Sequence, residues 1–127
     1  MSKIPDNLHY TKDHEWIKID GKRVTVGITD HAQHELTDIV FVELPKVGKV
    51  LKIHDVLGVV ESVKSASEVY APISGKVVDV NKTLEESPDT VNQDPYGKGW
   101  IAVIETSDPN EEKAFLTAAA YRKQIGE

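Results

Sequence analysis

The clearest chemical feature of this sequence is Lys64, which stands in the stretch GVVESVKSASEVYAPISGKV, residues 58–77. β-Branched residues precede and follow it, and Pro72 and Gly75 interrupt the way out, a pattern typical of two short strands joined by a turn. Small or polar neighbours leave the long side chain of Lys64 clear at the tip of this hairpin. An isolated lysine on a turn is most often a solvated surface charge, so its context decides between that interpretation and an acylation site.

The context of Lys64 is the pattern ESVKSA, which places Glu61 three residues before the lysine, with APISG following. This pattern resembles a lipoyl-attachment hairpin. The resemblance extends from about Leu8 to about Tyr121, and its motifs are YTKDHEW, GITDHAQ, DIVFVELPKVG, GVVESVK, VYAPISGKV and NQDPYGKGW. In content and order these motifs are similar to those of the glycine-cleavage H proteins.

The resemblance implies a carrier without catalytic residues, with lipoate attached covalently to Lys64 as a neutral amide. Such a carrier takes an aminomethyl group from a pyridoxal-phosphate glycine decarboxylase to an aminomethyltransferase that uses tetrahydrofolate. Its dithiol is reoxidised by dihydrolipoyl dehydrogenase. A lipoylating enzyme is the fourth implied partner, and we expect it to read the hairpin through its shape and through Glu61.

A second implied site residue is Glu15, in the motif HEW. The resemblance places this motif near a pocket in which the arm rests, which makes Glu15 a candidate for contacting the loaded amine. Considered alone, HEW has a plainer interpretation, a solvated strand edge with Trp16 in the core. An acid/base pair of His14 and Glu15 is a third and weaker interpretation.

The elements that must position these residues predict a mainly β fold. The resemblance implies a lipoyl/biotinyl-type barrel-sandwich hybrid of two small antiparallel sheets, with short helices and a C-terminal helix. We expect one lipoyl-carrier domain over residues 1–127, with the lysine hairpin at 56–78 and the C-terminal helix at about 109–125. A weak repeat, GKVLKIHDVL from Gly48 and GKVVDVNKTL from Gly75, agrees with a quasi-twofold sandwich.

Local patterns predict several turns and caps. Asp20-Gly21 between alternating apolar runs favours a hairpin with a type I′ turn. Thr29 or Asp30 can cap a short helix that runs through Leu36. Thr37 and His54 stand where the family commonly has glycine, so a positive φ at these positions would be a local departure from the family pattern.

The C-terminal segment predicts a capped helix. Asp108 can be its N-cap, Pro109 its first residue, and Glu111 the partner in a capping box. The sequence assigns its apolar face to Phe115, Leu116, Ala119 and Ala120. The final YRKQ, residues 121–124, is interpreted as a solvated helix end.

Composition limits the function further. The formal net charge is −6 without a basic cluster, which argues against a nucleic-acid partner. No stretch approaches the length of a transmembrane helix, and there are no cysteines for disulfides or thiolate chemistry. The amino terminus lacks a signal core or transit segment, so we expect a cytoplasmic protein, with a mature organellar form as the alternative. A carrier that visits several enzymes is most simply a monomer.

Several rival functions remain open at this point. A biotin carrier shares the hairpin but has Met on both sides of its lysine, whereas Val63 and Ser65 stand here. The others are a lipoyl domain of a 2-oxoacid dehydrogenase, an H-like relay for lipoyl or octanoyl groups, and an unmodified interaction module. A metal site at His31 and His34 lacks a third ligand, and no catalytic set supports a hydrolase.

Overall fold

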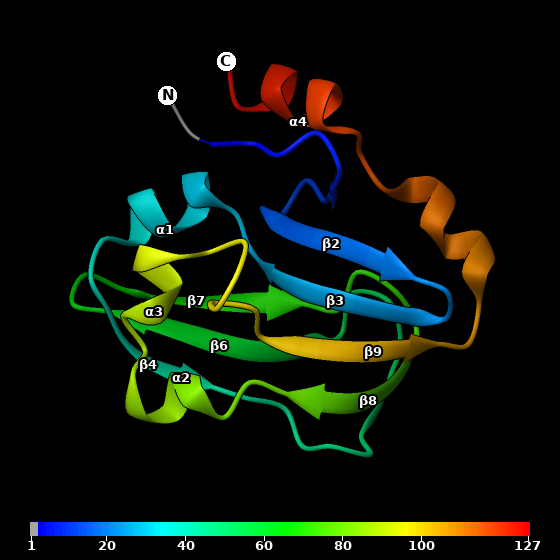
Figure 1. Cartoon of the computed structure of the whole chain (residues 1–127), viewed down its shortest axis with the longest axis horizontal. Coiled ribbons are helices and arrows are strands. Elements are labelled where there is room, and N and C mark those ends of the chain that lie inside the picture. Colours follow the sequence, from blue (N-terminus) through cyan, green and yellow to red (C-terminus); the bar gives the residue numbers. More distant parts are fainter. Residues whose placement is uncertain (1–2) are drawn as a thin grey trace.

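Two antiparallel β-sheets form the body of the molecule in this computed structural model, which describes residues 3–127 (Figure 1). The larger sheet has six strands in the order β1-β2-β3-β9-β8-β5, and the smaller has three in the order β4-β6-β7. The strands are β1 His9–Tyr10, β2 Glu15–Asp20, β3 Arg23–Ile28, β4 Ile39–Glu43, β5 Val50–Leu51, β6 Val56–Ser62, β7 Ala66–Tyr70, β8 Gly75–Val80 and β9 Ala102–Thr106. The helices are α1 Asp30–Leu36, α2 Thr83–Glu86, α3 Thr90–Gln93, the 3-10 helix η1 Pro109–Ala114 and α4 Ala118–Gln124.

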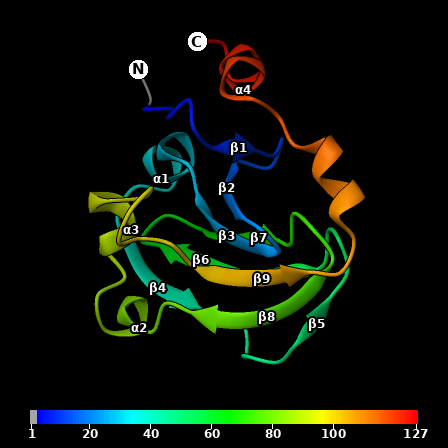
Figure 2. The same ribbon diagram turned by 45° about the vertical axis from the view of Figure 1, so that its right-hand side comes forward.

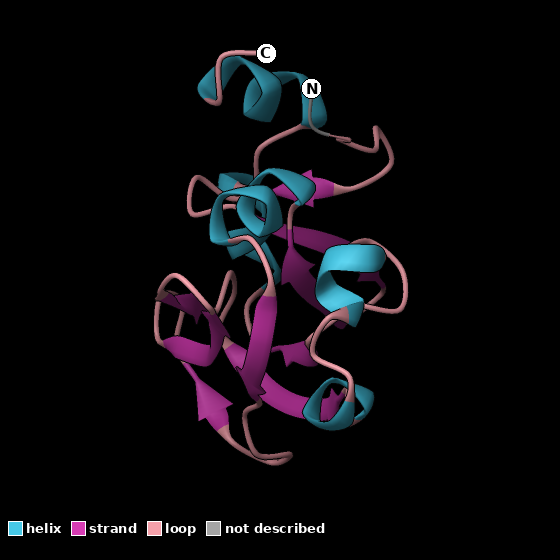
Figure 3. Ribbon diagram, turned by 90° about the vertical axis from the view of Figure 1, so that its left-hand side faces the viewer, coloured by secondary structure: helices cyan, strands magenta, loops and turns pink. Residues whose placement is uncertain are grey.

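This architecture confirms the predicted mainly β fold of two antiparallel sheets with short helices and a helix at the C-terminus (Figure 3). The principal core contains apolar residues from both sheets, among them Val24, Val26 and Ile28 of β3. The alternation of these three with more polar positions is the period of two that directs one face of a strand inward. Among residues 3–127, no helix has the length and apolar character needed to cross a bilayer.

The predicted hairpin at Asp20-Gly21 is present, but its turn differs from the expected type. Asp20 pairs with Arg23 in the ladder, so the loop residues are Gly21 and Lys22. Gly21 has a φ of 62°, and Lys22 is not among the described residues with positive φ. A glycine at the first loop position fits a type II′ turn, whereas type I′ needs positive φ at both positions. The type I′ prediction is therefore wrong. The loop also lies one residue later than predicted, at Gly21-Lys22 instead of Asp20-Gly21.

The lysine hairpin consists of β6 and β7, which pair from Val56↔Tyr70 to Glu61↔Ala66. The way out is shorter than the predicted hairpin over 56–78. β7 ends at Tyr70, and the chain then crosses from the smaller sheet to the larger, where β8 begins at Gly75. Pro72 in this crossing has no amide hydrogen to donate to a ladder, which is the physical reason for the interruption.

The two copies of the weak repeat lie side by side. β5 from the first copy pairs antiparallel with β8 from the second, through Val50↔Lys76 and Leu51↔Gly75 (Figure 2). The copies diverge after their first strands, because the first continues into β6 while the second continues into α2. The repeat thus identified a true pairing, although it does not extend over the whole of each copy.

The C-terminal segment is two helices where one over about 109–125 is predicted. η1 and α4 are separated at Phe115 and Leu116, where Leu116 forms an isolated bridge with Tyr10 of β1 (Figure 2). Asp108 caps η1 as expected, by accepting a hydrogen bond from the Asn110 amide. The sequence did not reveal the break because a β-bridge to a residue over a hundred positions away has no local pattern.

Two further details of the C-terminal prediction are wrong. The Glu111 carboxylate does not close a capping box; it accepts hydrogen bonds from the Ser74 amide at 2.7 Å and the Ser74 hydroxyl at 2.9 Å.

On α4, Ala118 and Tyr121 are buried, whereas Ala119 and Ala120 are exposed. The buried pair belongs to a second apolar cluster with Ile4, Leu8, Tyr10 and Trp16.

Candidate functional site

Lys64 lies at the tip of the β6–β7 hairpin in a turn organised by Ser62. The Ser62 hydroxyl oxygen accepts hydrogen bonds from the Lys64 amide at 3.1 Å and the Ser65 amide at 3.0 Å. The same hydroxyl lies 3.0 Å from the Ser65 carbonyl oxygen, to which it donates. The Val63 amide donates to the Asp38 carbonyl, which anchors the tip to the start of β4. The backbone that carries Lys64 is thus fixed by a serine of the ESVKSA motif.

The side chain of Lys64 is exposed, as the sequence predicts for the hairpin tip. Within residues 3–127 its ammonium makes no hydrogen bond or ion pair. The neighbouring Val63 is exposed as well, with an exposed fraction of 69%, so exposure alone does not distinguish the two positions. An accessible, unpaired ε-amine on a rigid turn can be acylated without breaking any interaction of the fold.

A cavity of about 190 Å³, here called the Lys64 cleft, is lined by both Lys64 and Glu15. One wall is the start of β2 and the loop before it, another is α1, and the third is the β6–β7 hairpin. Its lining residues are Asp13, His14, Glu15, Ile28, Ala32, Glu35, Leu36, Val60, Lys64, Ser65, Ser67, Glu68 and Val69. The structure therefore brings together two of the three site residues that the sequence singles out, Lys64 and Glu15.

The lining of the Lys64 cleft is strongly acidic. It contains the four carboxyl groups of Asp13, Glu15, Glu35 and Glu68, and Lys64 is the single lysine or arginine among its lining residues. Burial and the neighbouring His31 lower the pKa of His14, which favours its neutral form. Acylation of Lys64 would remove the one permanent positive charge, and the cleft would then attract a cation. Sequence reasoning missed Glu35 and Glu68, because only the folded chain brings them to the same cleft as Glu15.

Glu15 is buried, with an exposed fraction of 2%, so its interpretation as part of a solvated strand edge is wrong. Its Oε1 accepts a hydrogen bond from the Thr11 hydroxyl at 2.7 Å, and its Oε2 accepts one from the Tyr70 amide at 3.2 Å. Burial raises the pKa of Glu15 to about 7, against the opposing effect of these two hydrogen bonds. The carboxyl is therefore poised to change its charge when a cation arrives beside it.

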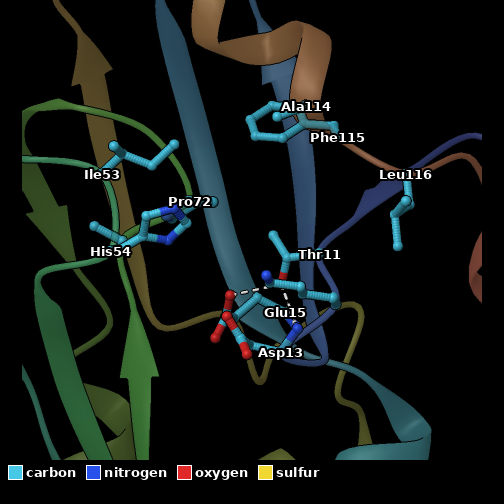
Figure 4. A pocket seen from close by; sticks show the side chains of 11 residues that line it. Thr11, Asp13, Glu15, Ile53, His54, Pro72, Ala114, Phe115 and Leu116 are labelled. Carbon is cyan, nitrogen blue, oxygen red and sulfur yellow. Dashed lines mark hydrogen bonds between the residues drawn. The ribbon is translucent and has the colours of Figure 1, made fainter.

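A second cavity of about 260 Å³ also has Glu15 in its lining (Figure 4). Thr11 and Asp13 line it from the side of Glu15, His54 and Pro72 from the opposite side, and Phe115 contributes from the segment between η1 and α4. Although larger, this cavity does not include Lys64. A tethered group must start at its lysine, so the Lys64 cleft is the better candidate for an arm.

Glu61 lies on β6, paired with Ala66 of β7 and with Phe41 of β4. It is half-buried and does not line the Lys64 cleft. In the described part of the chain its carboxylate has no hydrogen-bond or ion-pair partner. The structure thus separates Glu61 from the Glu15 site and gives its charge no role in holding the fold.

The other histidines of interest are held by carboxylates of their own helix. His31 Nε2 lies 3.1 Å from Glu35 Oε1, and His34 Nε2 lies 3.7 Å from Asp30 Oδ1. Both pairs have the spacing i, i+4 on α1. No cluster of three metal-ligating side chains occurs within residues 3–127.

The two positions at which the sequence departs from the family's glycines both have positive φ, 67° for Thr37 and 75° for His54. Thr37 is the C-cap residue that follows α1, and its amide donates to the Gln33 carbonyl. The His54 amide donates to the Ala71 carbonyl at 2.8 Å. These contacts hold the two residues in a region that favours glycine.

Tyr121 is the site residue that the sequence interpretation assigned wrongly. As part of YRKQ it is expected at a solvated helix end, but its side chain has an exposed fraction of 0%. Its hydroxyl oxygen lies 2.8 Å from His14 Nδ1, so α4 reaches the wall of the Lys64 cleft. The signal in the sequence is the helical spacing of Ala118, Tyr121 and Ile125, which pack in the same apolar cluster.

Comparisons with known proteins identify the family over nearly the whole chain. The family model described as "Glycine cleavage H-protein" matches residues 8–127. A glycine cleavage system H protein of Coprothermobacter proteolyticus is 54% identical over 126 residues, covering 98% of this chain and 99% of that protein. One from Halalkalibacterium halodurans is 50% identical, covering 100% of this chain and 99% of that protein.

A solved structure supports the same assignment. The crystal structure of a glycine cleavage system H protein from Mycobacterium marinum superposes with a TM-score of 0.89 at 42% identity, covering 98% of this chain and 100% of that one. Because the match includes the N-terminal hairpin and both C-terminal helices, it favours this family over biotin carriers and the lipoyl domains of 2-oxoacid dehydrogenases. The chain belongs to the glycine cleavage H-protein family, whose members are non-catalytic carriers of lipoyllysine.

Proposed function

We propose that Lys64 carries the lipoyl group of this glycine cleavage H protein and that the Lys64 cleft shelters the aminomethyl cargo between partner enzymes. The observation that supports this most strongly is the cleft itself, which joins an exposed, unpaired lysine to a buried carboxyl. A lipoyl arm on Lys64 would start within the lining of the cleft, to which Glu15 also belongs. The residues present therefore fit the group.

When bound, lipoate supplies a disulfide that accepts the aminomethyl group and a dithiol that is afterwards reoxidised. The protein's own residues need no general acid or base for this, since the partner enzymes provide them. What the chain contributes is the tether, which raises the effective concentration of the reactive end at each partner. The rigid Ser62 turn contributes as well, because it fixes the point from which the arm leaves.

The cleft has a charge suited to an amine. Its four carboxyl groups favour an ammonium, and Glu15 is the one among them that is fully buried and held from both oxygens. An adjacent ammonium stabilises the ionised carboxylate, so cargo binding would lower the pKa of Glu15 from about 7. Apolar side chains such as Ile28, Leu36 and Val69 limit the access of water to the hydrolysable end.

As a member of the glycine cleavage system, the chain works with the system's P, T and L proteins. We assign to these, in turn, the pyridoxal-phosphate decarboxylase, the tetrahydrofolate-dependent aminomethyltransferase and the dihydrolipoyl dehydrogenase. The lipoylating enzyme is a further proposed partner, and Glu61 is the residue it would read. An unpaired carboxylate beside the hairpin tip is suited to recognition because binding it disrupts no internal contact. The cytoplasmic location and the monomeric state stay predictions.

The proposal is tested by the retention of cargo. Lipoylated protein is loaded with glycine and the decarboxylase, the decarboxylase is removed, and the release of formaldehyde and ammonia is followed without the aminomethyltransferase. Glu15→Gln keeps the shape of the side chain but loses a charge-assisted hydrogen bond worth about 1.5–3 kcal/mol, so release should accelerate at least several-fold.

The control is the lipoylated fraction of Glu61→Gln, purified from any unmodified protein, because Glu61 lies outside the cleft. It should retain cargo as the wild type does. Equal release from wild type and Glu15→Gln, with both folded, would remove Glu15 from the proposal. Release from the wild type as fast as from the denatured protein would refute the shelter altogether.

A further inference from the structure

The hydroxyl of Tyr121 closes a small ring of hydrogen bonds beside the Lys64 cleft. It lies 2.8 Å from His14 Nδ1 and 2.8 Å from Thr29 Oγ1. The Thr29 amide in turn donates to the His14 carbonyl oxygen at 3.0 Å. Three residues from three parts of the chain are thereby tied to one another, and Tyr121 is the member that comes from α4.

The ring joins two walls of the cleft. His14 lines the cleft directly and is followed by Glu15, so its position determines where the Glu15 backbone begins. Thr29 caps α1, with its Oγ1 accepting from the Ala32 amide at 3.2 Å. Ala32, Glu35 and Leu36 of α1 form another wall of the cleft. Tyr121 therefore touches the residue that starts each wall.

His14 needs such an anchor because its backbone is strained. Its φ of 71° lies in the left-handed region, which is unfavourable for a residue other than glycine. The His14 amide donates to the Thr11 carbonyl at 3.2 Å, and its ring lies against that of His31 with centroids 5.0 Å apart. Within residues 3–127, the hydrogen bond of the His14 side chain is the one between its Nδ1 and the Tyr121 hydroxyl.

We propose that Tyr121 is a positioning residue for the Lys64 cleft: its hydroxyl fixes His14 against Thr29 and so sets the separation between the Glu15 wall and the α1 wall. The C-terminal helix thereby belongs to the cargo site without touching the cargo. This role rests on the proposed function of the cleft as a shelter for the arm. It deepens that function by adding a residue from the far end of the chain.

The chain offers a well-matched pair of variants for testing this role. Tyr121→Phe removes the hydroxyl but keeps the ring, which stacks on Tyr10 with centroids 4.9 Å apart and planes at 11°. Tyr10→Phe removes the hydroxyl of the other ring in the same stack, whose partner is the Pro5 carbonyl oxygen at 2.6 Å. Neither Tyr10 nor Pro5 lines the Lys64 cleft. Both variants alter the same buried cluster, and only Tyr121→Phe alters the ring at His14.

The first measurement uses the unlipoylated protein and does not depend on the proposed function. NMR titration follows the His14 ring, whose pKa is lowered by burial and by His31, with Glu35 and Asp13 acting in the opposite direction. In Tyr121→Phe the ring should loosen and gain water, so the pKa of His14 should rise toward its ordinary value. In Tyr10→Phe it should stay as in the wild type.

The second measurement is cargo release from the lipoylated proteins. Release from Tyr121→Phe should be about three- to tenfold faster than from wild type, as expected for the loss of one buried hydrogen bond, while Tyr10→Phe should match the wild type. A wild-type His14 titration in Tyr121→Phe overturns the positioning role, and so does unchanged release. Faster release from both tyrosine variants would indicate general loosening and would also overturn it. If Glu15→Gln fails to change release, the shelter itself fails, and the His14 titration still reports on Tyr121.

Discussion

The Tyr70 amide donates a hydrogen bond to Glu15 Oε2 at 3.2 Å across 55 residues of sequence. Glu15 begins β2 of the larger sheet, and Tyr70 ends β7 of the smaller one. Through this contact, the buried carboxyl of Glu15 in one sheet binds the end of β7, the strand that follows Lys64 in the other sheet. The two sheets and the proposed cargo site are thus joined through the same side chain.

The raised pKa of Glu15 predicts a pH-dependent stability. Its pKa is about 7 in the folded protein against the ordinary value of 4.5 for an exposed glutamate. Between these values the folded state binds more protons than the unfolded state, so the free energy of unfolding should fall as the pH rises from about 5 to 8. The contribution is on the order of 3 kcal/mol, and denaturant unfolding across this pH range should show most of it disappearing in Glu15→Gln.

Glu68→Gln is the control for this prediction, because Glu68 lines the same cleft but is exposed. Its stability should follow the wild-type pH dependence. Parallel curves for wild type and Glu15→Gln would show that Glu15 is ionised throughout this range in the folded protein.

The attachment hairpin could be predicted from sequence because its pattern is local. β-Branched runs, a polar tip and the resemblance around Lys64 all lie within a few residues of one another. The burial of Glu15 could not, since it depends on Tyr70, which lies 55 residues away at the end of β7 in the other sheet. The role of Tyr121 was hidden for the same reason, because its partners His14 and Thr29 are about a hundred residues away. The residues alone favoured a solvated strand edge for Glu15, whereas the resemblance made it a candidate for a pocket, and its burial agrees with a position inside the fold.

A one-residue shift of the lysine should sharply weaken recognition by the lipoylating enzyme. In Val63→Lys combined with Lys64→Val, the amine leaves the turn in a different direction, since neighbouring side chains on a strand or turn point to different sides. Position 63 is 69% exposed, so the shifted amine stays accessible. The rate of lipoylation in vitro should drop sharply relative to wild type. Equal rates would mean that the enzyme reads exposure alone.

Removing the Ser62 hydroxyl should slow lipoylation, because this hydroxyl accepts hydrogen bonds from the amides of Lys64 and Ser65. Ser62→Ala leaves these partly exposed amides to water, so unfolding should become easier by only about 1 kcal/mol. The lipoylation rate should fall several-fold, because the lysine backbone is no longer held. Ser67→Ala is the matched control, an exposed serine on β7 outside the turn. If both variants are lipoylated at the wild-type rate, the enzyme does not need a fixed turn.

The most direct test of the account is to locate the modification on protein from a host that lipoylates it. Tryptic mapping by mass spectrometry should find the lipoyl increment on the peptide that contains Lys64, with cleavage blocked there because the acylated side chain is neutral. Lys64→Arg keeps the charge and the exposure but removes the acylatable amine, so it should fold normally, carry no lipoate and fail to support glycine cleavage. A Lys64→Arg protein that still carries lipoate, or still supports glycine cleavage, would contradict the assignment.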